Sequence, residues 1–230
     1  MNDKNSHSLL YQPLWNYIKE KDAQTLTLSF AEIETIQGIP INHAFLNHKK
    51  ELHAYGWTCL KISLKEHHMT FLRLPENSRI LEKPHFSVLG KEGSTDEGPG
   101  FIQRLWSEAN NHFDQIAPFA KKDEKGKLCG LWGVMSDMTR SFKPWENNFS
   151  KGLYLAGVEC LDDIQTPEGW TCWNVPGFEY LSVPCDAENV FETTIAFLKT
   201  HKLRLVGAVH DFTNPSTGKS SMYFPIRSIQ

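Results

Sequence analysis

The residue in this chain whose type and position most clearly suggest chemistry is a glutamate inside an apolar segment. Glu159 lies within the stretch from Leu153 to Leu161, where alternation places it on the same strand face as Leu153 and Leu155. A carboxylate on a buried face needs a partner or a raised pKa. It could serve as the counter-charge of a cationic ligand or as a general base. The alternative is a structural hydrogen bond to a neighbouring backbone group or tyrosine, and the sequence leaves both open.

Aromatic residues could form the walls of a site around such a carboxylate. The chain has seven tryptophans, and ring faces attract desolvated cations by about 0.5–2 kcal/mol each. Ligand pockets are mostly apolar, with a few placed polar groups. We expect Trp132, Trp173 and Tyr180 to be pocket walls, while the competing interpretation of each is simple burial in a core.

The sequence contains no motif typical of metal binding, nucleophilic catalysis or nucleotide binding. The five cysteines include no C-x-x-C pair, and the ten histidines form no H-E-x-x-H or similar ligand pattern. There is no G-x-S-x-G, no P-loop and no G-x-G-x-x-G. We therefore predict no metal and no cofactor, and we name no catalytic residue. Binding is expected ahead of catalysis.

The composition indicates a folded protein that could hold these residues in place. The chain has 230 residues, of which 40% are hydrophobic and 22% charged, with a formal net charge of −3. Its apolar runs are much shorter than the roughly 20 residues of a membrane span. The first six residues contain no apolar signal region. We expect a cytoplasmic protein without membrane contact.

The chain is expected to divide into residues 1–75, a polar, proline-flanked linker at 76–83, and residues 84–230. In the last region the hydrophobic periodicity predicts a strand–helix–strand–strand order that occurs twice. The predicted fold class is α+β, with one antiparallel sheet, both helices on one face and the other face open as a cleft.

The first region has the element order of a winged helix-turn-helix. The pattern predicts a helix at 8–20, a strand at 25–28, a short helix, a third helix from Asn42, and strands at 57–62 and 68–72. Residues 1–75 hold 8 Lys and Arg against 7 Asp and Glu, a net charge of +1. DNA is therefore one expected partner, and a second protein is the alternative. The candidate DNA-binding residues are Asn42, Asn47, Lys49, Lys50 and Lys65.

Several motifs of the last region resemble the GyrI-like small-molecule-binding family, whose domain also accompanies bacterial AraC- and MerR-type regulators. The matching stretches are residues 86–91, 131–134, 154–159, 167–170, 175–180 and 223–226. The resemblance implies a ligand-binding domain with an aromatic pocket, a buried carboxylate, and amphipathic or cationic ligands. Some relatives are thought to hydrolyse small electrophiles. The first region resembles a small bacterial domain of unknown function, through residues 28–34, 39–40, 54–57 and 69–73.

One departure from the family concerns the acidic pocket residue. The family commonly has a glutamate just before the final strand, where this chain has Val209, His210, Asp211 and Phe212. Asp211 could replace that glutamate with a shorter side chain, or the alignment could be shifted by one residue. The complete set of candidate ligand-binding residues is Trp106, Trp132, Tyr154, Glu159, Trp173, Tyr180 and Asp211.

These observations predict a small-molecule effector-binding protein that acts as a one-component transcriptional regulator or sensor. A hydrolase that uses the same pocket is the second hypothesis. The third is a ligand-binding protein whose first region contacts another protein. The sequence predicts no particular oligomeric state.

Overall fold

The computed structural model describes residues 10–229. The chain forms two compact units, Met1–Arg79 and Ile80–Gln230. The segment at 76–83, which the sequence predicts as a linker, contains a strand, β4 (Arg79–Lys83). No helix within residues 10–229 has both the length and the apolar character needed to cross a membrane.

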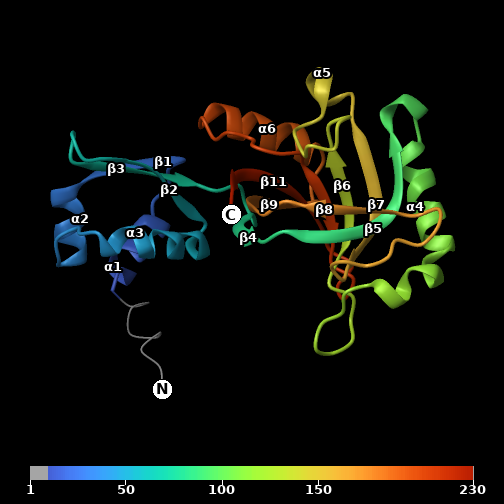
Figure 1. Cartoon of the computed structure of the whole chain (residues 1–230). Coiled ribbons are helices and arrows are strands. Elements are labelled where there is room, and N and C mark those ends of the chain that lie inside the picture. The colour runs from blue at the N-terminus through green and yellow to red at the C-terminus, as the bar shows by residue number, and fades with distance from the viewer. Residues whose placement is uncertain (1–9, 230) are drawn as a thin grey trace. The chain divides into compact units, whose positions relative to one another are not determined.

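The first unit contains short helices and one three-stranded sheet in the order β1-β3-β2 (Figure 1). Its elements are α1 (Gln12–Lys19), β1 (Thr25–Ser29), α2 (Phe30–Gln37), α3 (Ala44–His48), the 3-10 helix η2 (Lys49–Tyr55), β2 (Trp57–Ser63) and β3 (His68–Arg73). A capping box between Ser29 and Glu32 starts α2, because each of these two residues bonds the backbone of the other. The predicted element order is therefore present.

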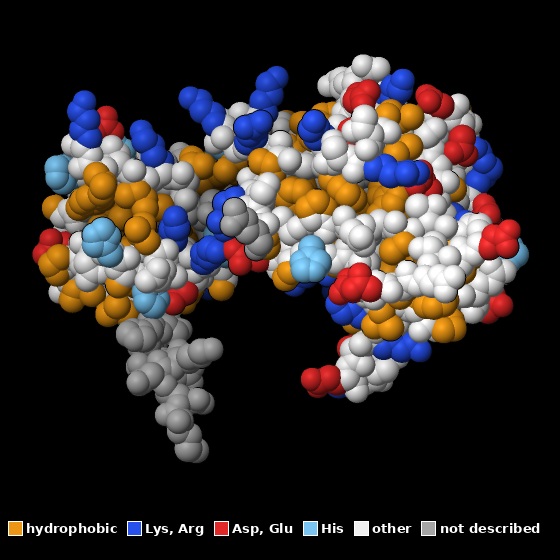
Figure 2. All heavy atoms as spheres, viewed as in Figure 1, with side chains coloured by type: hydrophobic (Ala, Val, Ile, Leu, Met, Phe, Trp, Pro, Cys, Tyr) orange, Lys and Arg blue, Asp and Glu red, His pale blue; other side chains and the backbone are white. Residues whose placement is uncertain are grey.

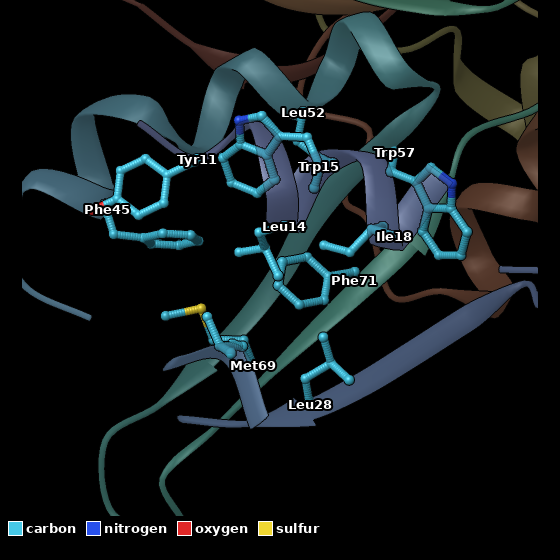
Figure 3. Packing of buried hydrophobic residues seen from close by; sticks show 11 residues of the cluster. Tyr11, Leu14, Trp15, Ile18, Leu28, Phe45, Leu52, Trp57, Met69 and Phe71 are labelled. Carbon is cyan, nitrogen blue, oxygen red and sulfur yellow. The ribbon is translucent and has the colours of Figure 1, made fainter. Parts of the chain in front are cut away.

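The core of this unit lies between α1 and the sheet (Figure 3). Leu14, Trp15 and Ile18 fall at helical spacing on α1 and are fully buried. They pack with Phe45 of α3 and with Phe71 of β3. The apolar stripe of α1 thus packs the helices of this unit against its strands.

The predicted third helix is divided in two. Only Ala44–His48 is α-helical, and the chain continues from Lys49 as 3-10 helix until Tyr55. The Asn42 side chain accepts a hydrogen bond from the Ala44 backbone N–H at 2.8 Å, which marks the start. A 3-10 segment turns more tightly than an α-helix, so residues three apart lie on one line.

The second unit is built around an eight-stranded sheet in the order β4-β9-β11-β10-β6-β7-β5-β8. Its other elements are β5 (Phe86–Ser94), η3 (Thr95–Glu97), α4 (Phe101–Asn111), η4 (Phe113–Gln115), η5 (Ala117–Phe119), β6 (Leu131–Ser136), α5 (Glu146–Phe149), β7 (Leu153–Cys160), β8 (Thr171–Val175), β9 (Phe178–Pro184), α6 (Val190–Thr200), β10 (His210–Thr213) and β11 (Ser220–Ser228). The strand pairs from β9 through β11, β10, β6, β7 and β5 to β8 are all antiparallel.

The predicted duplication is confirmed. One half runs β5–α4–β6–β7 and the other β9–α6–β10–β11. Within the sheet the two halves appear as mirror-image strand orders, β9-β11-β10 and β6-β7-β5, which meet at the pair β6–β10. The second unit is α+β, as the sequence predicts.

The sheet is strongly rolled. β4 and β5 stand at the first and seventh places of the strand order, yet only Pro84 and His85 connect them. The three Cα–Cα steps from Lys83 to Phe86 span at most about 11 Å, so the sheet must curl to bring these strands together. Gly90 and Gly157 are register partners of β5 and β7, and a Cβ on either would overlap backbone of the other strand. Their close approach needs glycine on both sides.

The two faces of the sheet differ in what covers them (Figure 1). On one, which we call the helix face, Phe101 and Leu105 of α4 pack on Tyr154 and Ala156. Phe191 of α6 also contacts a helix-face ring there, Phe224. The other, which we call the inner face, is the concave side of the roll. Its buried side chains pack mainly on one another: Phe86, Val88, Trp132, Val134, Leu153, Leu155, Trp173, Val175, Phe178, Tyr180 and Tyr223.

Candidate functional site

The seven candidate ligand-binding residues divide between the two faces of the sheet. Because register partners in an antiparallel pair share a face, the strand pairing assigns each of them. Trp132, Glu159, Trp173 and Tyr180 lie on the inner face. Tyr154 and Asp211 lie on the helix face, and Trp106 reaches them from α4. The structure therefore separates the candidates into two groups that do not share one pocket.

The helix face contains an apolar hollow of about 210 Å³. Its floor comes from strands and its walls from α6 and from the turn at α5. The lining residues are Met135, Trp145, Phe149, Phe191, Val209 and Met222. Three aromatic rings and two flexible methionines can adapt to ligands of different outline.

A polar chain runs beside the floor of this hollow. The Trp106 indole N–H donates to the Tyr154 hydroxyl at 3.1 Å, and that hydroxyl donates to Asp211 Oδ2 at 2.9 Å. Asp211 is the register partner of Met222, and Tyr154 is the partner of Met135. Register partners have Cβ atoms about 5 Å apart, so both polar residues adjoin the hollow.

A glycine makes this polar chain possible. Gly133 lies between Tyr154 and Asp211, and a Cβ on Gly133 would overlap the Tyr154 hydroxyl. The missing side chain lets the tyrosine reach across β6 to the carboxylate on β10. This glycine belongs to the stretch 131–134 that resembles the GyrI-like family.

Asp211 is a carboxylate with little to balance its charge. Within residues 10–229 its side chain receives one hydrogen bond, from Tyr154, and no salt bridge. Burial raises the pKa of Asp211 above its usual value, and the bond from Tyr154 opposes that rise. Burial and the charge of Asp211 likewise raise the pKa of Tyr154. A cation placed here would favour the ionised form of Asp211.

Glu159 on the inner face has the opposite environment. Its side chain is 4% exposed, and Lys83 Nζ lies 3.0 Å from Oε2 while Lys121 Nζ lies 3.4 Å from Oε1. The Trp132 indole N–H also donates to Oε2, at 3.2 Å. Buried carboxylates are tolerated when they are paired in this way. Two lysines therefore already balance the charge of Glu159, which the sequence predicts as a possible counter-charge for a cationic ligand.

The remaining inner-face candidates are tightly enclosed. The Trp173 indole N–H donates to Glu92 Oε2 at 2.7 Å, and Tyr180 is fully buried against Phe178 and Tyr223. His210 is also fully buried, and its Nδ1 accepts a hydrogen bond from the Met135 backbone N–H at 3.2 Å. Burial lowers the pKa of His210 to about 3, so this imidazole is neutral. His210 faces away from Asp211, its neighbour in β10.

The turn over the hollow has an unusual backbone. Asn147, Asn148 and Phe149 are consecutive residues with φ of 49°, 55° and 65°. Left-handed backbone is common for asparagine and rare for a bulky residue such as phenylalanine. The Phe149 ring packs edge-on against Phe191, with 5.1 Å between centroids. One wall of the hollow is thus held in place against its own backbone preference.

Cys160 and Cys172 form a thiol pair elsewhere on the second unit. Their Sγ atoms are 3.9 Å apart, but β5 lies between the strands that hold them. Two strand spacings are about 9.6 Å, beyond the Cα separation of roughly 7 Å that a disulfide tolerates. Within the described residues no three His, Cys, Asp or Glu side chains gather as a metal site.

The candidate DNA-binding residues of the first unit lie in the segment from Asn42 to Lys50 and in the turn between β2 and β3. Asn47 and Lys50 are exposed near the junction of α3 and η2, while Lys49 is half-buried. Lys65 is exposed in the turn between β2 and β3, next to Leu64, which is 75% exposed. The Asn42 side chain accepts a hydrogen bond from the backbone N–H of Ala44. By comparison, Figure 2 shows acidic and basic side chains interspersed on the visible face of the second unit.

Comparisons with known proteins found distant structural similarity only. No family model and no curated protein matches the chain. SAV2435 bound to tetraphenylphosphonium is 12% identical, with a TM-score of 0.46, over 66% of this chain and 94% of that one. The EcmrR C-terminal domain is 12% identical, with a TM-score of 0.45, over 66% of this chain and 98% of that one. An EcmrR–DNA complex is 11% identical, with a TM-score of 0.46, over 81% of this chain and 63% of that one.

Proposed function

We propose that the second unit binds a small, amphipathic aromatic cation in the hollow of the helix face. Asp211 carries this proposal, because it is a carboxylate beside an apolar hollow with no cation of the protein paired to it within residues 10–229. Trp145, Phe149 and Phe191 present rings to the same space. Rings and a carboxylate at an apolar hollow together favour an organic cation.

A matched pair of ligands tests the charge requirement. N-methylquinolinium and methylnaphthalene have nearly the same outline and differ in charge. We expect the cation to quench tryptophan fluorescence with a dissociation constant in the micromolar range, about −8 kcal/mol. Asp211→Asn should weaken the cation about tenfold and the neutral compound less than twofold, since a tenfold change is about 1.4 kcal/mol.

Two further variants make the result specific to the hollow. Trp145→Phe should remove most of the quenching, because Trp145 lines the hollow. Asp186→Asn, at an exposed carboxylate, should leave both affinities unchanged. An equal loss of both ligands in Asp211→Asn would show that Asp211 only supports the fold, and the proposal would then be wrong.

Hydrolysis of a small electrophile is the second candidate for the same hollow. The hydrogen bond between Tyr154 and Asp211 favours it, because a carboxyl group with a raised pKa can exchange a proton beside a bound substrate. If the wild type hydrolyses a small aromatic epoxide and Asp211→Asn does not, the hydrolase would be the better-supported function. Binding without turnover would favour a sensor.

For the first unit we propose DNA binding, which would make the chain a one-component regulator. The element order and the strand order β1-β3-β2 support this proposal, together with the exposed Lys50 and Lys65. Replacing Lys49 and Lys50 by Glu should abolish binding to the upstream DNA of the gene, and wild-type affinity should fall steeply with salt. Absence of binding by the wild type at low salt would refute the regulator proposal and favour a protein partner.

A further inference from the structure

The ammonium group of Lys83 has three kinds of partner on the inner face. It lies 3.0 Å from Glu159 Oε2, 4.3 Å from the centroid of the Phe86 ring and 5.2 Å from that of the Trp132 ring. The Lys83 side chain is only 22% exposed. Two ring faces and a carboxylate around one partly desolvated ammonium are the elements of an aromatic cage for cations.

The cage is itself rigidly built. Phe86 and Trp132 contact each other with 4.7 Å between centroids, and Trp132 also packs against Phe212 and Tyr223. The Trp132 indole N–H fixes the Glu159 carboxylate from a third side. These partners belong to β5, β6 and β7 and do not involve β4, so they would stay in position without Lys83.

Lys83 comes from a strand that the hydrogen-bond order places far from Glu159. β4 is the first strand of the order and β7 the sixth, which in a flat sheet would put them about 24 Å apart. A lysine side chain reaches only a fraction of that distance. The contact between Lys83 and Glu159 therefore bridges the opening of the roll.

We propose that Phe86, Trp132 and Glu159 form an ammonium-binding site, and that Lys83 fills it as an internal ligand that fastens β4 to the rolled sheet. The site selects a primary alkylammonium, the group that Lys83 presents. The chain enters the second unit through β4, which pairs with β9 at one edge of the sheet, so occupation of this site gives that entry strand a second attachment. The proposal concerns the inner face and is independent of ligand binding in the hollow.

Chemical rescue tests this directly. Lys83→Ala removes three methylene groups and the ammonium, which together correspond to propylammonium. We expect Lys83→Ala to lower Tm by about 5 °C, and millimolar propylammonium to restore at least half of that loss. Propanol, its neutral counterpart, should restore nothing. The wild type should not respond, because Lys83 already occupies the cage.

Lys121→Ala is the matched control. Lys121 also pairs with Glu159, at 3.4 Å, but its side chain is 47% exposed, and within residues 10–229 its ammonium lies over no aromatic ring. Propylammonium should therefore not rescue Lys121→Ala. Equal rescue of both variants, a similar shift of the wild type, or no rescue of Lys83→Ala would each overturn the proposal.

A second variant serves if Lys83→Ala does not fold. Lys83→Met keeps most of the length of the side chain and removes its charge. Hydrogen exchange of the β4 amides, such as that of Leu81, should become at least tenfold faster in Lys83→Met than in the wild type. The amides of β6 and β7 should keep their protection. Unchanged exchange in β4 would show that Lys83 does not fasten this strand.

Discussion

The two faces of the rolled sheet each hold a carboxylate, and the two are in opposite electrostatic states. Asp211 on the helix face has one neutral hydrogen-bond donor and a raised pKa. Glu159 on the inner face has two lysines and an indole N–H. The comparison teaches that a partly buried carboxylate becomes available to a cationic ligand when the protein leaves its charge unbalanced. By that criterion the helix face is the one that we propose binds a ligand.

The largest expected effect comes from removing the charge of Glu159. Glu159→Gln would leave Lys83 close to two rings without its carboxylate, and breaking a buried pair in this way typically costs about 3–5 kcal/mol. We expect a lower free energy of unfolding in urea titrations. Glu108→Gln is the control, because Glu108 pairs with Lys91 at 3.0 Å but is 53% exposed, and it should cost less than about 1 kcal/mol. If the Glu159→Gln variant were as stable as this control, the charge of Glu159 would not be balanced more strongly than that of Asp211, and the comparison would be wrong.

The second effect is a pH dependence confined to the helix face. Because the pKa of Asp211 is raised, a cationic ligand must displace a proton at acidic pH, so affinity should increase with pH through that pKa and then level off. The same raised pKa contributes stability that is present below the unfolded-state pKa and lost as pH rises through the folded-state pKa. Titrations of N-methylquinolinium from acidic to neutral pH measure the first effect. The Asp211→Asn variant should give a flat profile, and a sloping one would assign the proton to another group.

The smallest effect separates the two lysines that pair with Glu159. Lys121→Met removes a half-exposed ammonium while Lys83 and Trp132 still contact the carboxylate. Exposed pairs contribute about 0–1 kcal/mol, so the free energy of unfolding should change by less than that. Thermal unfolding of this variant beside the wild type is a sufficient measurement. A loss as large as that of Glu159→Gln would mean that both lysines are needed.

The sequence predicts the fold of the second unit well, because its signals are periodic. Alternation along the segment 153–161 correctly places Glu159 with Leu153 and Leu155, and the repeated order of elements predicts the two halves of the sheet. Periodicity within one strand does not relate that strand to the next. The division of the candidates between two faces therefore becomes visible only with the register, which pairs Tyr154 with Met135 and Asp211 with Met222.

Other parts of the two sites carry no sequence signal of their own. Trp145, Phe149 and Phe191 belong to a turn and a helix, and only the fold of residues between them brings their rings together. Lys83 lies in a polar stretch with prolines. Such a composition is typical of a linker, but this stretch contains the strand β4. One signal for Lys83 did exist, since its short distance in sequence from Phe86 restricts how far apart β4 and β5 can be.

The left-handed turn at Asn147, Asn148 and Phe149 has a consequence for the timing of binding. Holding each of these residues in that backbone region costs about 1–2 kcal/mol, less for asparagine, and contacts such as that between Phe149 and Phe191 offset the cost. Moving such a wall away from the hollow would recover that backbone cost, so it would need less free energy than moving an unstrained wall. For the ligand that we propose, this wall would therefore affect the rates of entry and release, and hence the residence time, more than the affinity.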